Sequence, residues 1–226
     1  MFFSFRFKLM IFIIILLCAV LVSCSQNPVS VSQLDLKWST LMQRAHLKNI
    51  WGSSENDIYA VGYNGMILHF DGSSWLNMKS GTMGCLKAVW GSSSNDIFAA
   101  GDNGVILHFD GSEWNKMESK SIWHISAIWG TAWNNVYAVC VGGILHYDGN
   151  SWSMICHTRN DYNDIWGVSA TDIFTVGVSG EIGHFDGSVW SRMRSGVTQN
   201  LVSVCGGSSD NVFADGENGV ILHYDG

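Results

Sequence analysis

The sequence predicts an all-β fold of five similar four-stranded units, and three observations lead to this prediction. A Trp-Gly pair recurs at 51–52, 90–91, 129–130 and 166–167, and Cys205-Gly206 takes the fifth place, so the steps are 39, 39, 37 and 39 residues. Each pair is followed by an apolar run and then by a His-Phe/Tyr-Asp-Gly segment. A period of about 40 residues with four short strands is typical of a β-propeller blade. No 3.6-residue periodicity persists after position 30, which excludes a helical solenoid. We therefore predict a five-bladed β-propeller of four-stranded antiparallel blades.

The first repeat predicts four short strands separated by turn signals. The strands are, in order, 47–51, 57–62, 66–70 and one around Trp75, with 52–56 as the first turn. The second strand is apolar on both faces, as expected for a strand between two neighbouring sheets. Asn64-Gly65 predicts a type I′ hairpin, because both residues tolerate positive φ, and Asp71-Gly72 predicts the next tight turn.

The N-terminal end of the predicted propeller carries a strand without a repeat of its own. In four repeats the tryptophan of the fourth strand is followed two or three positions later by methionine, and Trp38 with Leu41 has similar spacing ahead of the first Trp-Gly pair. The last repeat stops at Gly226 after its third strand. We therefore predict that residues 34–226 form a ring closed by the N-terminal strand, which completes the last blade. The alternative is that the sequence is a fragment of a larger ring.

Residues 1–23 have the composition of a secretion signal, since Arg6 and Lys8 precede a long apolar run that ends in Leu-Val-Ser before Cys24. This tetrapeptide resembles the lipobox of bacterial lipoproteins. The resemblance implies that Cys24 is lipidated and becomes the first mature residue, with residues 24–33 as a polar tether. The expected location is the bacterial cell envelope, with the chain lipid-anchored to the outer membrane or to the outer face of the cytoplasmic membrane. An uncleaved N-terminal membrane anchor is the alternative.

Charge and cysteine content narrow the range of partners. The chain has 12 basic and 19 acidic residues, and removal of Arg6 and Lys8 with the signal leaves 10 and 19, a net charge of −9. This balance argues against nucleic acid or anionic lipid headgroups as partners.

The mature cysteines fall at different points of the repeat, so they form no repeated disulfide framework. Cys140 with Cys156 is the one pair that the sequence leaves open.

Two sets of polar residues occupy equivalent positions in the five repeats. Before each Asp-Gly turn stands a histidine, at His69, His108, His146, His184 and His223. We expect these to be structural, each bonding the aspartate of its own turn or the backbone. Directly before the first strand of each repeat stand His46, Cys85, His124, Asp161 and Asn200. Because first strands line the central channel, these five residues are predicted to converge on the channel mouth as the candidate binding site.

Four of the five residues at the predicted mouth are of metal-ligand type, which leaves two interpretations open. One is a metal site at His46, Cys85 and His124. The other, which we favour, is that the position needs only a turn-compatible polar residue, with no metal or other cofactor. The loops that lead into the next repeat vary most and are expected to set specificity; they are 79–84, 118–123, 155–160 and 194–199.

The sequence contains no motif that indicates catalysis. Asp161, Asp164, Asp102 and Glu217 are the loose carboxylate candidates for a glycosidase near the predicted mouth. The Gly-x-Ser-x-Gly and His-Glu-x-x-His motifs and a phosphate loop are absent. We therefore expect a protein that is not an enzyme, with a glycoside-active or lectin-like propeller as the alternative.

From Trp51-Gly52 to Trp75 and in its copies, the chain resembles the bacterial secreted β-propeller repeat of the Trp-Gly type, over residues 38–226. That pattern is distantly similar to propellers of the photosystem II assembly-factor and sialidase-repeat kind. The resemblance implies a propeller fold and transfers no functional residue, because the sialidase Asp-box order is absent. The expected function is that of a membrane-anchored extracytoplasmic lipoprotein whose non-catalytic propeller binds a protein or glycan partner through loops on one face.

Overall fold

The computed structural model describes residues 45–158 and 161–226. Their strands form five antiparallel sheets, four with four strands and one with three, and within each sheet neighbouring strands follow one another in the sequence. The predicted all-β architecture of five blades is therefore confirmed. In the part of the chain that the structure describes, no helix has the length and hydropathy needed to cross a membrane.

The strands of the five blades have the following bounds. Blade 1 consists of β1 (Leu47–Ser54), β2 (Asp57–Gly62), β3 (Ile67–Phe70) and β4 (Trp75–Met78). Blade 2 consists of β5 (Leu86–Ser93), β6 (Asp96–Gly101), β7 (Ile106–Phe109) and β8 (Trp114–Met117). Blade 3 consists of β9 (Ile125–Ala132), β10 (Asn135–Cys140), β11 (Gly143–Tyr147) and β12 (Trp152–His157). Blade 4 consists of β13 (Tyr162–Ser169), β14 (Asp172–Gly177), β15 (Ile182–Phe185) and β16 (Trp190–Met193). Blade 5 consists of β17 (Leu201–Ser208), β18 (Asn211–Gly216) and β19 (Ile221–Tyr224).

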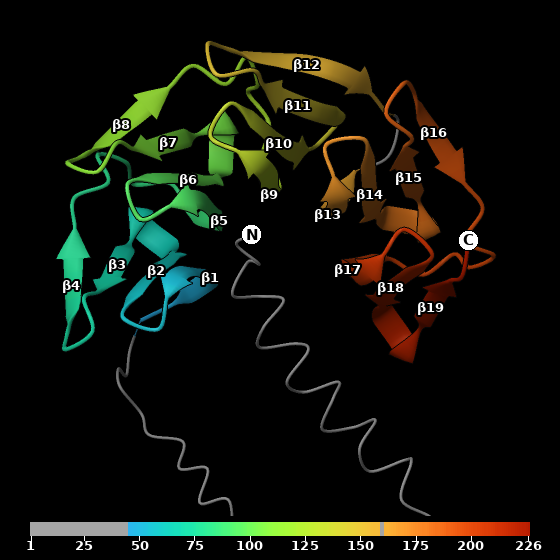
Figure 1. Ribbon diagram of the computed structural model, residues 1–226, viewed down its shortest axis with the longest axis horizontal. Helices are drawn as coiled ribbons and strands as arrows, with labels where there is room; N and C mark the ends of the chain where they lie inside the picture. Colours follow the sequence, from blue (N-terminus) through green and yellow to red (C-terminus); the bar gives the residue numbers. More distant parts are fainter. Residues whose placement is uncertain (1–44, 159–160) are drawn as a thin grey trace, which may run out of the picture. The chain divides into compact units, whose positions relative to one another are not determined.

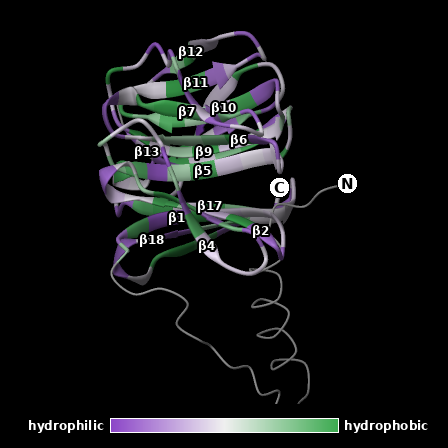
Figure 2. Ribbon diagram, turned by 90° about the vertical axis from the view of Figure 1, so that its left-hand side faces the viewer, coloured by the Kyte–Doolittle hydropathy of each residue, from purple (hydrophilic) through white to green (hydrophobic). Residues whose placement is uncertain are grey.

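Within residues 47–226 the blades follow one another around an arc (Figure 1). The first strands of the blades, β1, β5, β9, β13 and β17, lie on the inside of the arc, and β4, β8, β12 and β16 lie on the outside. Hydrophobic residues run along the strands, whereas hydrophilic residues gather at the turns on both ends of the strands (Figure 2). The core is therefore formed between blades, where the face of one sheet packs against the next.

The hairpin between the second and third strands has the predicted geometry. Asn64 and Gly65 have φ values of 57° and 67°, and the Met66 N–H donates to the Tyr63 carbonyl over 3.1 Å. Asn103, Ser179 and Asn218 repeat the positive φ in blades 2, 4 and 5. Asparagine and glycine are favoured here because both central residues of a type I′ turn require positive φ.

The first strand of each blade is longer than predicted. The expected turn over residues 52–56 was wrong, because Gly52 pairs with Ile58 and Ser54 pairs with Asp57 inside the sheet. Only Glu55 and Asn56 make the turn. The equivalent glycines of blades 2 to 5 have another role, which lies in the packing between blades.

The Trp-Gly pair joins consecutive blades. A Cβ placed on Gly91 would lie 2.6 Å from Cη2 of Trp51, so the indole of blade 1 occupies the space above this glycine in blade 2. Trp90 over Gly130, Trp129 over Gly167 and Trp166 over Gly206 repeat the contact at the next three junctions. Since each indole needs the missing side chain of the following blade, the two residues recur together with the same period.

The predicted closure of the ring is not confirmed. Among the described residues the fifth sheet has three strands, and Trp38 lies outside these residues, as do the signal 1–23 and the tether 24–33. The two end blades also keep exposed faces. Phe213 in blade 5 is 37% exposed where Phe98 in blade 2 is fully buried, and Ile50 in blade 1 is 51% exposed where Val89 is 5% exposed.

The cysteines of the described region form no disulfide. Cys140 is buried and its Sγ lies 3.5 Å from the Gly143 carbonyl. Cys156 lies opposite Ile144 on the neighbouring strand, whereas Cys140 lies opposite Gly143. The Cys140–Cys156 pair that the sequence left open is therefore not formed in this structure.

Candidate partner-binding face

One face of the propeller combines the turns between second and third strands with the loops that enter the next blade, and we call it the mouth face. Backbone hydrogen bonds hold the two kinds of segment together. The Asp102 N–H donates to the Cys85 carbonyl over 2.9 Å, and the Glu217 N–H donates to the Asn200 carbonyl over 2.9 Å. The mouth face comprises residues 63–66, 79–85, 102–105, 118–124, 141–142, 161, 178–181, 194–200 and 217–220.

The predicted mouth residues lie at equivalent positions, and their backbone has a structural role. The carbonyls of Cys85, His124, Asp161 and Asn200 each accept a hydrogen bond from the turn of their own blade. His46 is exposed directly before β1. The Asn200 side chain links two blades, because its Oδ1 accepts from the Ser179 N–H of blade 4 over 3.0 Å and its Nδ2 donates to Glu217 of blade 5 over 3.2 Å. The polar preference at this position is thus explained in part by contacts between turns.

An ion-pair network spans blades 2 and 3 on the mouth face. Asp102 Oδ1 lies 2.9 Å from Lys87 Nζ and 3.1 Å from His124 Nδ1, and the Cys85 N–H donates to Asp102 Oδ2 over 3.3 Å. Desolvation opposes ionisation of Asp102, but the hydrogen bond and charge of Lys87, together with the Cys85 N–H and His124, outweigh it and hold the pKa of this carboxyl below its usual value. Desolvation, followed by the Asp102 charge, raises the pKa of the Cys85 thiol. This cysteine is thus a buried neutral thiol, and His124 is the exposed member of the network.

Large apolar side chains are exposed on the same face, and they are not among the residues predicted as a binding site. Met83 is 81% exposed, Ile122 78%, Trp123 54% and Tyr63 46%. Lys48 Nζ lies 4.8 Å from the centre of the Tyr63 ring, within the range of a cation–π contact. The signal that would have found them is the occurrence of large apolar residues within loops otherwise rich in glycine and serine.

The loops that carry these side chains are close together. Gly84, next to Met83, lies against Asp102, since a Cβ on this glycine would be 3.6 Å from the Asp102 Cβ. Asp102 in turn contacts His124, which follows Trp123. The apolar tips of two consecutive loops therefore flank the ion-pair network. Beside Met83 lies a depression of about 400 Å³, lined by residues 63–66 and 77–83.

The carboxylates considered for glycoside chemistry are distributed over three blades, and three of them make hydrogen bonds or ion pairs within or between blades. Asp164 is 6% exposed and accepts hydrogen bonds from the Ser203 hydroxyl over 2.9 Å and from the Val204 N–H over 3.1 Å, which ties blade 4 to blade 5. Asp102 pairs with Lys87, and Glu217 accepts from Asn200. Asp161 precedes β13 on the mouth face. The glycosidase alternative receives no support from this arrangement.

His46, Cys85 and His124 are not brought together as a metal site. Within residues 45–158 and 161–226, no three histidine, cysteine, aspartate or glutamate side chains are grouped so that they could hold a metal ion. His124 is instead engaged with Asp102, and Cys85 is buried. The interpretation of this position as a polar turn residue fits the observed contacts.

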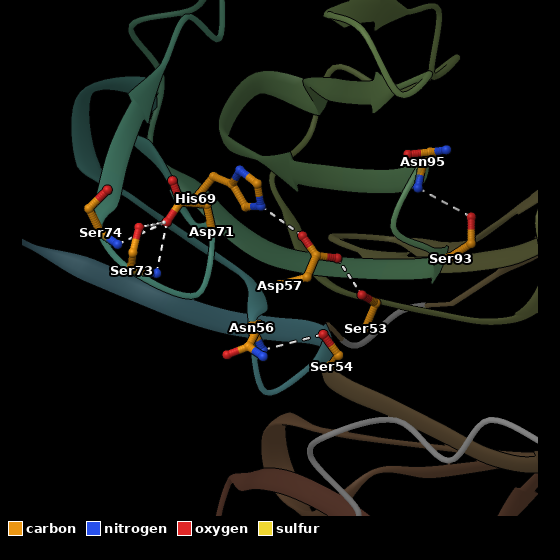
Figure 3. A network of polar contacts seen from close by, with 10 residues as sticks. All are labelled: Ser53, Ser54, Asn56, Asp57, His69, Asp71, Ser73, Ser74, Ser93 and Asn95. Carbon is orange, nitrogen blue, oxygen red and sulfur yellow. Dashed lines mark hydrogen bonds and ion pairs between the residues drawn. The ribbon is translucent and has the colours of Figure 1, made fainter.

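Each of the five repeated histidines makes a hydrogen bond within its own blade, near the ends of the strands opposite the mouth face. Figure 3 shows the contacts of His69 in blade 1. His69 Nε2 lies 2.7 Å from Asp57 Oδ1, and the Ser53 hydroxyl donates to the other oxygen of Asp57. Tyr59 stacks on the His69 ring with centroids 4.3 Å apart. Equivalent contacts join His108 to Asp96, His146 to Asn135, His184 to Asp172 and His223 to Asn211.

The partner predicted for these histidines was wrong. Each bonds the residue that opens the second strand. Asp71 of the following turn instead accepts from the Ser74 N–H and from the hydroxyl and N–H of Ser73, and these hydrogen bonds lower its pKa to about 2. The sequence does contain a signal for the observed partner, because aspartate or asparagine is the first residue of the second strand in every repeat. The carboxylate lies between serine and histidine, so the histidine cannot take the serine proton as in a catalytic triad.

Comparison with known proteins gives structural likeness alone. No family model matches the chain, and no curated protein matches it. Among solved structures, YCF48 from Cyanidioschyzon merolae is 17% identical with a TM-score of 0.59, over 75% of this chain and 66% of that chain. YCF48 bound to D1 peptide is 15% identical with a TM-score of 0.65, and the match covers 84% of this chain and 69% of that chain. The WD40 β-propeller domain of Doa1 is 12% identical with a TM-score of 0.68, and the match covers 83% of this chain and 67% of that chain. The chain thus spans about two thirds of the length of these proteins, and at such identities the likeness shows the fold, a β-propeller.

Proposed function

We propose that the chain is a non-catalytic propeller that binds a protein partner on its mouth face. The observation that carries this proposal is the exposure of Met83, Ile122 and Trp123 on two consecutive loops. Large apolar groups gathered on one face are typical of interaction sites, and tryptophan, methionine and tyrosine are enriched in the centres of protein interfaces. A protein ligand is also the kind of ligand held in the structurally similar YCF48 complex with a D1 peptide.

The polar residues of the mouth face supply orientation and selectivity in this proposal. Asp102 and Lys87 offer paired charges beside the apolar loop tips, and the polar ring of His124 lies next to Asp102. Charged groups at the rim of an interface mainly set the specificity and rate of association, whereas the desolvated apolar groups supply most of the affinity. Asp161 and Asn200 extend the polar surface towards blades 4 and 5.

Replacing the three apolar loop residues together should abolish partner capture and leave the fold intact. The variant Met83→Ser, Ile122→Ser, Trp123→Ser removes side chains that are 54% to 81% exposed, so its free energy of unfolding should stay within about 0.5 kcal/mol per substitution of wild type. Loss of the buried interface centre should weaken binding by about 2 kcal/mol or more, roughly thirtyfold. The measurement is affinity capture from the host envelope, with soluble glycans added to a parallel sample.

The matched control is Trp133→Ser, in the turn between β9 and β10 away from the mouth face, where the side chain is 57% exposed. Capture by the control should equal that of wild type. Equal capture by the triple variant, or competition by glycans and not by protein, would reject a protein-binding mouth face.

We further propose that the propeller is anchored to a membrane in the bacterial envelope by lipid on Cys24. The support is the Leu-Val-Ser-Cys sequence after the apolar run, which lies outside the described residues. Cys24→Ser should abolish incorporation of labelled fatty acid and shift the chain to the aqueous phase of a detergent partition. Cys205→Ser, in blade 5, should leave labelling unchanged. Labelled Cys24→Ser protein would contradict lipidation at this cysteine.

A further inference from the structure

Blades 1 and 2 use the same position of the mouth face in different ways. Lys48 and Lys87 are the second residues of β1 and β5. Tyr63 and Asp102 open the turns that follow β2 and β6. In blade 2 the two side chains form an ion pair of 2.9 Å, whereas in blade 1 Lys48 Nζ lies 4.8 Å from the centre of the Tyr63 ring. Blade 1 thus keeps the lysine but has a phenol ring at the place where blade 2 has a carboxylate.

The contact with Tyr63 leaves the positive charge of Lys48 in place. The face of an aromatic ring attracts a cation, but the ring itself carries no net charge. Lys48 is exposed, and within residues 45–158 and 161–226 it forms no ion pair with a carboxylate. Blade 1 therefore presents a cation on the mouth face that a carboxylate from outside the propeller can reach.

A depression with largely apolar walls begins at Tyr63. Its volume is about 400 Å³, and its lining includes Met66, Met78, Lys79 and Met83. Met83 is 81% exposed, so its thioether is available to a ligand. Thioethers are polarisable, adapt to irregular shapes and make favourable contacts with aromatic rings. Three methionines beside a phenol ring therefore suit an aromatic side chain.

The charges around this depression differ from those of the neighbouring blades. Residues 63–66 and 77–83 contain one charged side chain, Lys79, and no carboxylate. On blades 2 and 3 the carboxylates of the mouth face are paired, Asp102 with Lys87 over 2.9 Å and Glu118 with Lys120 over 2.8 Å. In a chain with 19 acidic and 12 basic residues, the depression and Lys48 thus form a part of the surface with two cations and no anion. Charge complementarity favours a negatively charged group on the partner.

We propose that this part of the mouth face, the blade 1 site (residues 48, 63–66 and 77–83), binds a segment of the protein partner in which an aromatic side chain stands next to an aspartate or glutamate. The aromatic side chain enters the depression against the methionines, and the carboxylate pairs with Lys48 and Lys79. The inference rests on the protein-binding function proposed above and names the chemistry that the partner presents.

Short random peptides displayed on phage test this specificity with the full chain. Phage retained by wild type are depleted on the variant Lys48→Gln, Lys79→Gln, which leaves the peptides that depend on the two lysines. These peptides should carry aspartate or glutamate next to phenylalanine, tyrosine or tryptophan far more often than the unselected library does. Lys116→Gln, which removes an exposed lysine on β8 outside the mouth face, should retain the same phage.

A double-mutant cycle with one selected peptide locates the carboxylate. Lys48→Gln should raise the dissociation constant about tenfold, and so should replacement of the acidic residue of the peptide by its amide. The two changes together should cost little more than either alone, because they remove the same contact. Met83→Ser should also raise the dissociation constant about tenfold, which a purely ionic site would not show. Lys116→Gln should leave the dissociation constant unchanged.

Selected peptides without acidic residues, additive losses in the cycle or full affinity for Met83→Ser would overturn the inference. Retention of phosphatidylglycerol vesicles in place of peptides would assign the site to a lipid surface and overturn it too. The same holds for self-association of wild type that Lys48→Gln abolishes, which would assign the site to a second copy of the chain.

The outcome can be separated from that of the proposed function. Loss of the host partner by the variant Met83→Ser, Ile122→Ser, Trp123→Ser, with full capture by Lys48→Gln, Lys79→Gln, would keep the mouth face as the binding surface and reject the acidic and aromatic specificity. Full capture by both variants would reject the two proposals together.

Discussion

Replacing Trp90 by alanine is expected to lower the free energy of unfolding by about 3–5 kcal/mol, the range for truncation of a buried tryptophan. Trp90 is 7% exposed, packs against Phe98 with centroids 6.3 Å apart, and lies over Gly130 of the next blade. Its loss leaves a cavity at the junction of blades 2 and 3. Urea unfolding followed by circular dichroism measures the change.

Trp133→Ala is the control for this substitution, because the Trp133 side chain is 57% exposed in a turn. It should change the free energy of unfolding by no more than about 0.5 kcal/mol. Equal effects of the two substitutions would mean that the indoles at the blade junctions do not hold the propeller together.

Gly91→Ala is expected to destabilise the chain by about 1–3 kcal/mol, although alanine is a small residue with ordinary backbone preferences. The added Cβ would lie 2.6 Å from Cη2 of Trp51, whose indole is 6% exposed, so the indole or the strand that carries residue 91 must shift. Gly207→Ala is the matched control, since the nearest atom to a Cβ there is 3.4 Å away and the residue also lies in a first strand. Thermal and urea unfolding of both variants check the difference.

A double-mutant cycle assigns the cost of Gly91→Ala to one contact. In a Trp51→Ala background the methyl group of Ala at position 91 enters the space left by the indole, so the second substitution should cost little or be stabilising. The coupling energy should be about 1–3 kcal/mol in favour of the double variant. Additive effects would show that the glycine is required for a reason other than the indole above it.

The fold was predictable because each repeat contains residues that fit only a few backbone conformations or packing environments. Asn64-Gly65 marks a turn that needs positive φ twice, and the turn has this geometry. The Trp-Gly period reports a contact between blades that is made four times. The glycine of the Trp-Gly pair was misread as a turn because, in blades 2 to 5, a glycine required by a neighbouring indole looks in the sequence like a glycine required by φ. Only the packing of two blades separates the two cases.

The candidate site was less predictable, because its features depend on what surrounds each residue. The position of His124 and Asn200 could be read from the repeat, but their contacts with turns of the preceding blade could not. The histidine at position 69 showed a conserved place within the repeat without showing that its partner is Asp57, twelve residues earlier. Exposure of Met83 and Trp123 is a property of the folded loops, since elsewhere in this chain the same residue types form the core.

The proposed mouth face is tested most directly by titrating the captured partner against three forms of the purified chain. These are wild type, the triple variant Met83→Ser, Ile122→Ser, Trp123→Ser, and the control Trp133→Ser. We predict equal dissociation constants for wild type and the control, and a dissociation constant roughly thirtyfold higher or more for the triple variant, which corresponds to about 2 kcal/mol. Equal affinity of all three forms would contradict the assignment of the mouth face as the binding surface.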